Sequence, residues 1–121
     1  MQVLFRAKEK NSNNYVIGYE YYNHVEDEYY ITHYVSGSNY KVDRTTRSIN
    51  IEDMIDSQGN EIFASFSEDG KGGDIVKIRD SDFKYVYKYI KGRFMLDSME
   101  LLDSMELMNP YLLFQKIGIQ Q

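Results

Sequence analysis

The stretch from Tyr15 to Val35 reads YVIGYEYYNHVEDEYYITHYV and predicts a β-hairpin. Aromatic and β-branched residues recur at every second position on both sides of the acidic segment Glu26-Asp27-Glu28. This pattern is typical of pleated, half-buried strands that are joined by a solvated turn. The chain has 12 tyrosines and 6 phenylalanines among 121 residues, and the same alternation continues beyond the hairpin. The sequence therefore predicts a mainly β protein with an N-terminal hairpin region.

Outward from the hairpin, short predicted strands alternate with clusters of turn residues at positions 11–14, 36–39, 57–60 and 70–73. The predicted strands are Val3–Ala7, Tyr15–Tyr22, Glu28–Val35, Tyr40–Val42, Ser48–Ile51, Glu61–Phe66, Asp74–Arg79, Phe83–Ile90, Arg93–Leu96 and Leu112–Ile119. Many short strands at this spacing favour a small barrel or roll over an α/β sheet. The length of 121 residues predicts one domain, residues 1–121.

One segment departs from the strand pattern. Residues 96–107 contain two consecutive copies of Leu-Asp-Ser-Met-Glu-Leu. In each copy an aspartate stands three residues before a glutamate, which is similar to a helix capping box, and Asn109-Pro110 would end the segment. We therefore predict one short helix near residues 97–108. Six residues turn a helix by about 600°, so the second copy would face about 120° away from the first, whereas in a strand it would keep the alternation of faces.

The composition excludes several classes of protein. Without cysteine, the chain has no disulfides, zinc–thiolate sites or thiol nucleophiles. No apolar run approaches the roughly 20 residues that span a bilayer, so we expect no membrane association and a soluble, cytoplasmic protein. The net charge of −5 argues against non-specific binding to duplex DNA, because such binding depends on basic side chains that neutralise phosphates.

Residues that could carry chemistry do not form a convergent set. His24 and His33 are nine positions apart, unlike common metal-binding pairs, and the strand alternation makes His33 a hydrogen-bonded structural residue. Asp56, Gln58 and Asn60 begin like a calcium loop, but no glutamate stands at its twelfth position. The glycine cluster 70–73 precedes a strand, so it predicts a tight turn with positive φ. We expect no enzyme, no catalytic or metal-binding residue and no cofactor.

The predicted hairpin supplies a candidate surface for a partner protein. If the odd-numbered residues of Tyr15–Val35 face inward, Tyr22, Tyr30 and Tyr34 project outward together with Glu20 and Glu28. Exposed tyrosines are favoured at protein interfaces. The candidate partner-binding residues are Tyr22, Tyr30, Tyr34, Glu26 and Glu28.

A second candidate surface lies in residues 77–93, where basic residues alternate with aromatic ones. Tyrosines beside lysines can stack and neutralise single-stranded nucleic acid. However, Phe83, Tyr85, Tyr87 and Tyr89 share one face of a predicted strand, which favours a core role. The alternative nucleic-acid-binding residues are Lys77, Arg79, Lys84, Lys88, Lys91 and Arg93. A small-molecule sensor, a third possibility, would need a pocket lined by the same aromatic face.

Three landmarks resemble the YopX-like family of phage and prophage proteins. The first is the start, Leu4-Phe5-Arg6-Ala7-Lys8, which lacks the tryptophan that usually follows in the family. The second is the segment from Asp56-Ser57-Gln58-Gly59-Asn60-Glu61-Ile62-Phe63 to Gly73-Asp74-Ile75-Val76, with a longer connection than the commonest version. The third is the end, Phe114-Gln115-Lys116-Ile117-Gly118-Ile119, without the family's asparagine. The resemblance implies a single YopX-like domain related to small SH3-like barrels and an origin in a mobile element. It supplies no catalytic residues.

These observations predict a non-enzymatic phage- or prophage-encoded accessory protein that acts by binding a partner protein, for which a host protein is one candidate. The alternative is a role linked to nucleic acid. In that case the chain would bind single strands through residues 77–93, or its acidic segments would mimic DNA and inhibit a host defence protein. Binding to labelled single strands at increasing salt concentration separates the two versions. True phosphate contacts weaken steeply with ionic strength, whereas a DNA mimic would not bind nucleic acid.

Overall fold

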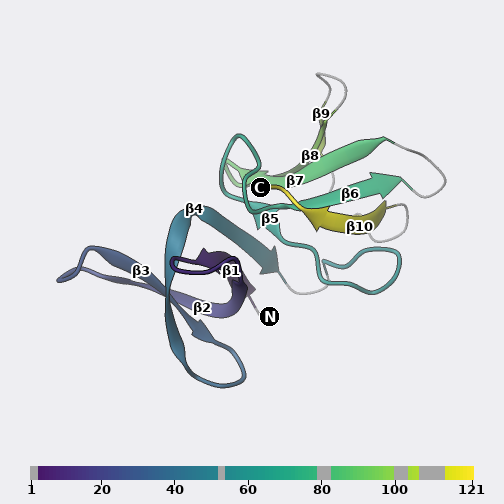
Figure 1. Ribbon diagram of the computed structural model, residues 1–121. Helices are drawn as coiled ribbons and strands as arrows, with labels where there is room; N and C mark the ends of the chain where they lie inside the picture. The colour runs from purple at the N-terminus through teal and green to yellow at the C-terminus, as the bar shows by residue number, and fades with distance from the viewer. Residues whose placement is uncertain (1–2, 52–53, 79–82, 100–103, 107–113) are drawn as a thin grey trace.

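The computed structural model describes residues 3–51, 54–78, 83–99, 104–106 and 114–121, and these ranges hold ten β-strands and no helix (Figure 1). The strands are β1 (Val3–Glu9), β2 (Tyr15–Asn23), β3 (Glu28–His33), β4 (Asn39–Ile51), β5 (Ala64–Ser65), β6 (Asp74–Ile78), β7 (Lys84–Ile90), β8 (Arg93–Ser98), β9 (Ser104–Glu106) and β10 (Phe114–Ile119). The predicted mainly β fold is confirmed.

The first four strands form a small closed barrel. Each strand from β1 to β4 pairs antiparallel with the next, and β1 also pairs with β4, which closes the ring. The barrel is filled by Ala7, Val16, Ile31 and Val42, one from each strand. The predicted strands 40–42 and 48–51 are the two ends of the single strand β4, which has 13 residues and can therefore serve two sheets.

The second half of the chain builds a sheet around β7. Antiparallel partners β6 and β8 flank β7, β10 lies outside β6, and β9 lies outside β8. The short strand β5 pairs with both β4 and β7, so it joins the barrel to this sheet (Figure 1). The core between them contains Ile49, Met54, Ile62, Ala64, Val76, Tyr87, Phe94 and Leu96.

A buried ion pair connects the two halves. Arg6 of β1 and Asp74 of β6 have side chains only 3% and 0% exposed, and Nη2 of Arg6 lies 2.9 Å from Oδ1 of Asp74. The same Nη2 donates to the carbonyl of Gly72 at 2.8 Å, while Oδ2 of Asp74 accepts the Phe63 amide at 2.8 Å. The guanidinium also lies 4.7 Å from the centre of the Phe63 ring. This buried contact region therefore helps to fix the barrel against the sheet.

The last strand is tied into the same region by two aspartates. Lys116 of β10 places its ammonium 3.5 Å from Oδ1 of Asp74, and its amide donates to Oδ2 of Asp56 at 2.9 Å. Asp56 also accepts the amides of Gln58 and Asn60, so its carboxylate organises the turn before Glu61. Burial raises the pKa of Asp56, but these hydrogen bonds together outweigh it, and the net pKa is lowered.

The predicted helix near residues 97–108 is wrong. The described parts of this segment are β8 and β9, which pair so that Leu96 lies opposite Met105 and Asp97 opposite Ser104. The described parts of the two copies thus lie in strands that pair with each other. Asp97, the first predicted capping residue, instead forms an ion pair: its carboxylate lies 2.5 Å from the ammonium of Lys88 on β7. Backbone pairing with β7 along β8 outweighed a weak local helix signal.

Candidate functional site

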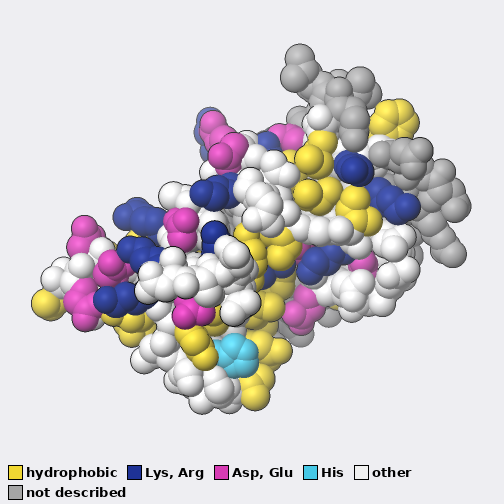
Figure 2. Space-filling model, in the orientation of Figure 1, with side chains coloured by type: hydrophobic (Ala, Val, Ile, Leu, Met, Phe, Trp, Pro, Cys, Tyr) yellow, Lys and Arg dark blue, Asp and Glu magenta, His cyan; other side chains and the backbone are white. Residues whose placement is uncertain are grey.

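The β2–β3 hairpin extends beyond the barrel as a two-stranded arm. Among the described strands, Tyr21–Asn23 of β2 pair only with Glu28–Tyr30 of β3, although Tyr30 also pairs with Lys41 of β4. The arm ends in the turn 24–27, far from the β7 sheet (Figure 1). Figure 2 shows acidic and basic side chains gathered over the arm. The structure therefore presents the predicted hairpin as a projecting element.

One side of the hairpin forms a row of tyrosines that we call the outer tyrosine face, made of Tyr19, Tyr21, Tyr30 and Tyr34. Tyr19, Tyr21 and Tyr34 are 49%, 41% and 48% exposed. Tyr21 stacks on Tyr30, its partner across the strands, with ring centres 5.1 Å apart and planes 7° apart. Stacked rings have little rotational freedom left to lose, so this face is preorganised for contact.

The predicted orientation of β2 is wrong. Directly paired residues share a face, and β2 pairs odd with even positions of β3, as in Tyr21 with Tyr30 and Tyr22 with Tyr29. Ile31 fills the barrel, so the even residues of β2 face inward with it. Tyr22 consequently lies on the inner side, 5.0 Å from the Tyr29 ring, whereas Tyr19 and Tyr21 take the outer positions.

The inner side of the hairpin is occupied by contacts within the chain. Glu20, expected on the outside, accepts two hydrogen bonds from Arg47 of β4, at 2.8 and 2.5 Å. The Arg47 guanidinium also lies 5.3 Å from the centre of the Tyr29 ring. This side fastens the hairpin to β4, which leaves the outer tyrosine face as the available one.

Side-chain hydrogen bonds hold the tip of the arm in shape. Oδ1 of Asn23 accepts the amides of Val25 and Glu26, at 3.0 and 3.1 Å. Tyr22 donates to Asp27, and Tyr30 donates to Glu26 at 2.5 Å. The bond to Glu26 is the largest of the effects that raise the pKa of Tyr30 to about 12.

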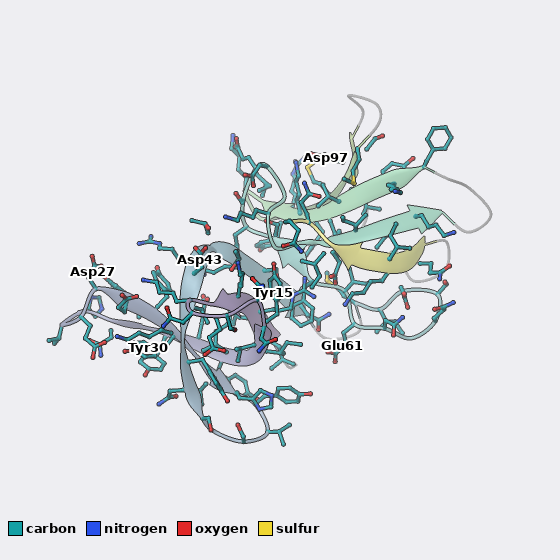
Figure 3. All side chains as sticks on the ribbon, viewed as in Figure 1. Tyr15, Asp27, Tyr30, Asp43, Glu61 and Asp97 are labelled. Carbon is teal, nitrogen blue, oxygen red and sulfur yellow. The ribbon has the colours of Figure 1, made fainter. Side chains whose placement is uncertain are left out.

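The predicted acidic residues of the tip are partly neutralised. Glu28 forms an ion pair with Lys10 at 2.9 Å, and Glu26 lies 3.7 Å from the ammonium of Lys41. Figure 3 shows Asp27 near the end of the arm and Tyr30 on its flank. Val25, at the apex, is 96% exposed. The tip therefore presents partly neutralised acidic groups around an exposed aliphatic side chain.

The turn at the other end of β3 continues the outer tyrosine face. Apart from Val35, its sequence, Tyr34-Val35-Ser36-Gly37-Ser38-Asn39-Tyr40, consists of residue types that are enriched in antibody binding loops. Nδ1 of His33 accepts the amides of Val35 and Ser36, at 3.3 and 3.1 Å, as expected for a hydrogen-bonded structural histidine. Val35 is 75% exposed.

The basic stretch 77–93 does not form one continuous set. Lys84, Lys91 and Arg93 are exposed, and Lys77 is half-buried and pairs with Lys84 across β6 and β7. Lys88 is only 9% exposed and is paired with Asp97, while Arg79 lies outside the described residues. The arrangement removes Lys88 from any surface that could track a phosphate backbone.

The aromatic face of the same stretch is mostly core. Tyr87 is fully buried, and this burial raises the pKa of its hydroxyl. Tyr85 and Tyr89 pack partly buried against the core, but Phe83 is 49% exposed at the start of β7. The Tyr89 ring lies 4.4 Å from the Phe94 ring. The core role predicted for this face is therefore confirmed for all its members except Phe83.

Two findings limit the kinds of site in the described part of the chain. No group of three His, Asp or Glu side chains there could hold a metal ion. None of its segments is a helix with the length and hydrophobicity needed to cross a membrane.

Comparisons with family models, with curated proteins and with solved structures found no match to this chain. The resemblance to the YopX-like family therefore stays a prediction.

Proposed function

We propose that this chain is a non-enzymatic accessory protein of a phage or prophage, acting in the cytoplasm by binding a partner protein through the outer tyrosine face. The observation that carries the binding proposal is the set of three tyrosines that are 41–49% exposed on one face of a braced hairpin. The phage or prophage origin rests on the sequence resemblance alone.

Two properties of these tyrosines favour binding: a large contact area and a small loss of side-chain entropy when a partner binds. Tyrosine offers a large apolar ring and a hydroxyl that can donate or accept, and it loses only two side-chain torsions on binding. The stacked Tyr21 and Tyr30 rings and the hydrogen-bonded turns at both ends of β3 reduce that loss further. The surface suits a partner protein with a flat face of mixed polarity.

The test compares two neighbouring positions on β2 that face opposite ways. The double variant Tyr19→Ser/Tyr21→Ser should lose a partner that the unaltered protein retains in affinity capture from host lysate. Tyr22→Phe keeps the inner ring and should retain that partner. Retention of every partner by the double variant, with an unchanged thermal unfolding midpoint, would refute the proposal.

The nucleic-acid alternative is tested separately. The charge-reversed variant Lys84→Glu/Lys91→Glu should capture the same partner, and capture should survive nuclease treatment. Unaltered protein should not bind a labelled single-stranded oligonucleotide in low salt. Oligonucleotide binding that weakens with salt and disappears in the charge-reversed variant would favour the nucleic-acid role instead.

A further inference from the structure

A depression of about 310 Å³ lies away from the arm (Figure 3) and is lined by Glu68, Lys88, Ile90, Met95 and Asp97. The pairing of β7 with β8 sets Lys88 opposite Met95, on the face of the hairpin that points away from the buried ring of Tyr87. The loop that contains Glu68 crosses this face. A methyl group on Gly70 of that loop would lie only 2.8 Å from a methyl carbon of Val86. The loop thus forms one side of the depression, and β7 and β8 form its base.

Among the described residues, one N–H of the Lys88 ammonium in this depression has no acceptor. A lysine ammonium has three N–H donors. Two of them serve the Glu68 carbonyl and Oδ2 of Asp97, both at 2.5 Å. No other described residue accepts the third. Burying the lysine to 9% exposure is costly unless its donors are satisfied, so an acceptor at this point is favoured.

Asp97 offers the complementary group. Its side chain is 32% exposed, and only Oδ2 contacts the lysine. Oδ1 accepts no hydrogen bond from any described residue. The carboxylate stands on β8, next to β9 (Figure 3). A basic donor and an acidic acceptor therefore lie side by side in a depression that Ile90 and Met95 also line.

We propose that this depression binds a small zwitterion, an α-amino acid with an apolar side chain. Its carboxylate accepts the third N–H of Lys88, its ammonium donates to Oδ1 of Asp97, and its side chain packs on Ile90 and Met95. One carbon atom carries both charged groups of an amino acid, which matches the adjacency of Lys88 and Asp97. Charge-assisted hydrogen bonds are about twice as strong as neutral ones, which favours a zwitterion over an amide. The volume is at the lower end for ligand sites, as expected for a small molecule.

The experiment is a titration of ¹⁵N-labelled protein with L-leucine, followed by NMR. We expect saturable shifts at Lys88, Ile90, Met95 and Asp97 in the millimolar range. Leucinamide lacks the carboxylate, N-acetyl-leucine lacks the ammonium, and glycine lacks the apolar side chain, so each should bind more weakly. Equal shifts with all four compounds, or no saturable shift near the depression, would overturn the proposal.

A variant gives an independent measure. Asp97→Asn keeps the size of the side chain and an acceptor for Lys88 but removes the charge, so leucine affinity should fall about tenfold or more. Asp27→Asn, on the arm, should leave the affinity unchanged. Unaltered affinity in a folded Asp97→Asn protein contradicts the proposal. If that variant does not fold, the ligand series on the unaltered protein decides the matter. The proposal does not depend on partner binding through the outer tyrosine face.

Discussion

Tyr21 and Tyr22 are adjacent in β2 but have opposite surroundings. Tyr21 is 41% exposed and stacks on Tyr30, whereas Tyr22 packs against Tyr29 on the inner side. The role of a tyrosine in this hairpin therefore depends on whether its position faces outward or inward, and on which carboxylate accepts a hydrogen bond from its hydroxyl. Hydrogen bonds from tyrosine hydroxyls to Asp27 and Glu26 show that acids of the tip position the rings as well as carry charge.

We expect Glu26→Gln to lower the pKa of Tyr30 from about 12 towards the ordinary value of 10.0. The carboxylate favours the neutral phenol by accepting its proton in a hydrogen bond, and glutamine removes the charge that does so. Absorbance at alkaline pH, or the NMR signal of the Tyr30 ring, measures the change. Glu28→Gln is the matched control and should have a much smaller effect. Equal shifts in the two variants would contradict the assignment.

Asp56→Asn should make the protein less stable at neutral pH and less sensitive to acid. The folded pKa of Asp56 lies below its ordinary value of 3.8, so its stabilisation is complete above that pH and is lost as the pH falls through the folded pKa. Losing the charged acceptor for these part-buried hydrogen bonds should cost about 2 kcal/mol near pH 7. Urea unfolding at several pH values measures this, with Asp27→Asn as control. A steeper acid dependence in Asp56→Asn would be inconsistent with this explanation.

At the scale of strands, the sequence predicted where most strands lie but not which way each one faces. Alternation locates β2 and β3, yet their register depends on close backbone approach at Gly18. A methyl group there would lie 1.9 Å from the carbonyl oxygen of Thr32. Alternation alone contains no information about that contact. The alternation therefore predicts the outer side correctly for Tyr30 and Tyr34 on β3 and its following turn. It gives the wrong side for Tyr19 and Tyr21 on β2.

The β8–β9 hairpin shows the same limit. A capping signal is local, but the pairs Leu96–Met105 and Asp97–Ser104 form between positions that only the fold brings together. The Lys88–Asp97 ion pair is non-local in the same way, and so it and the depression beside it could not be read from the spacing of charges. The even length of the repeat was the signal compatible with strands.

Gly18→Ala should disrupt the pairing of β2 with β3. The added methyl group cannot be accommodated without moving the backbone of β3, so we expect a loss of about 3 kcal/mol in the free energy of unfolding. Gly118→Ala in β10 is the control, since a methyl group there would have no atom within 4 Å, and it should change stability by less than about 0.5 kcal/mol. Equal stability of the two variants in urea unfolding would show that the register tolerates a side chain.

On the scale of the whole molecule, the barrel and the β7 sheet share few backbone pairs, and these run through β5, which has only two residues. The buried Arg6–Asp74 ion pair and the core cluster supply the remaining connection. Arg6, Asp56, Asp74 and Lys116, all within the three family-like landmarks, meet at this junction. The quoted landmarks thus have a structural role here, whatever the origin of the chain.

Replacing Arg6 should destabilise both halves together. Arg6→Met fills similar space but leaves the Asp74 carboxylate without its guanidinium partner, and breaking a buried pair in this way typically costs about 3–5 kcal/mol. Lys10→Met removes the exposed pair with Glu28 and should cost at most about 1 kcal/mol. Tyrosine fluorescence and circular dichroism during urea unfolding should change together. Two separate transitions in the unaltered protein would mean that the junction does not couple the halves.

The junction also has a consequence for synthesis on the ribosome. All four barrel strands lie within the first 51 residues, so the barrel can close while the remainder is still being translated. At that stage Arg6 lacks the carboxylate of its buried ion pair, because Asp74 lies on β6 and is translated later. The nascent barrel therefore stays short of its final stability until β6 has left the exit tunnel, and chains released before that point should be preferred substrates for cellular proteases.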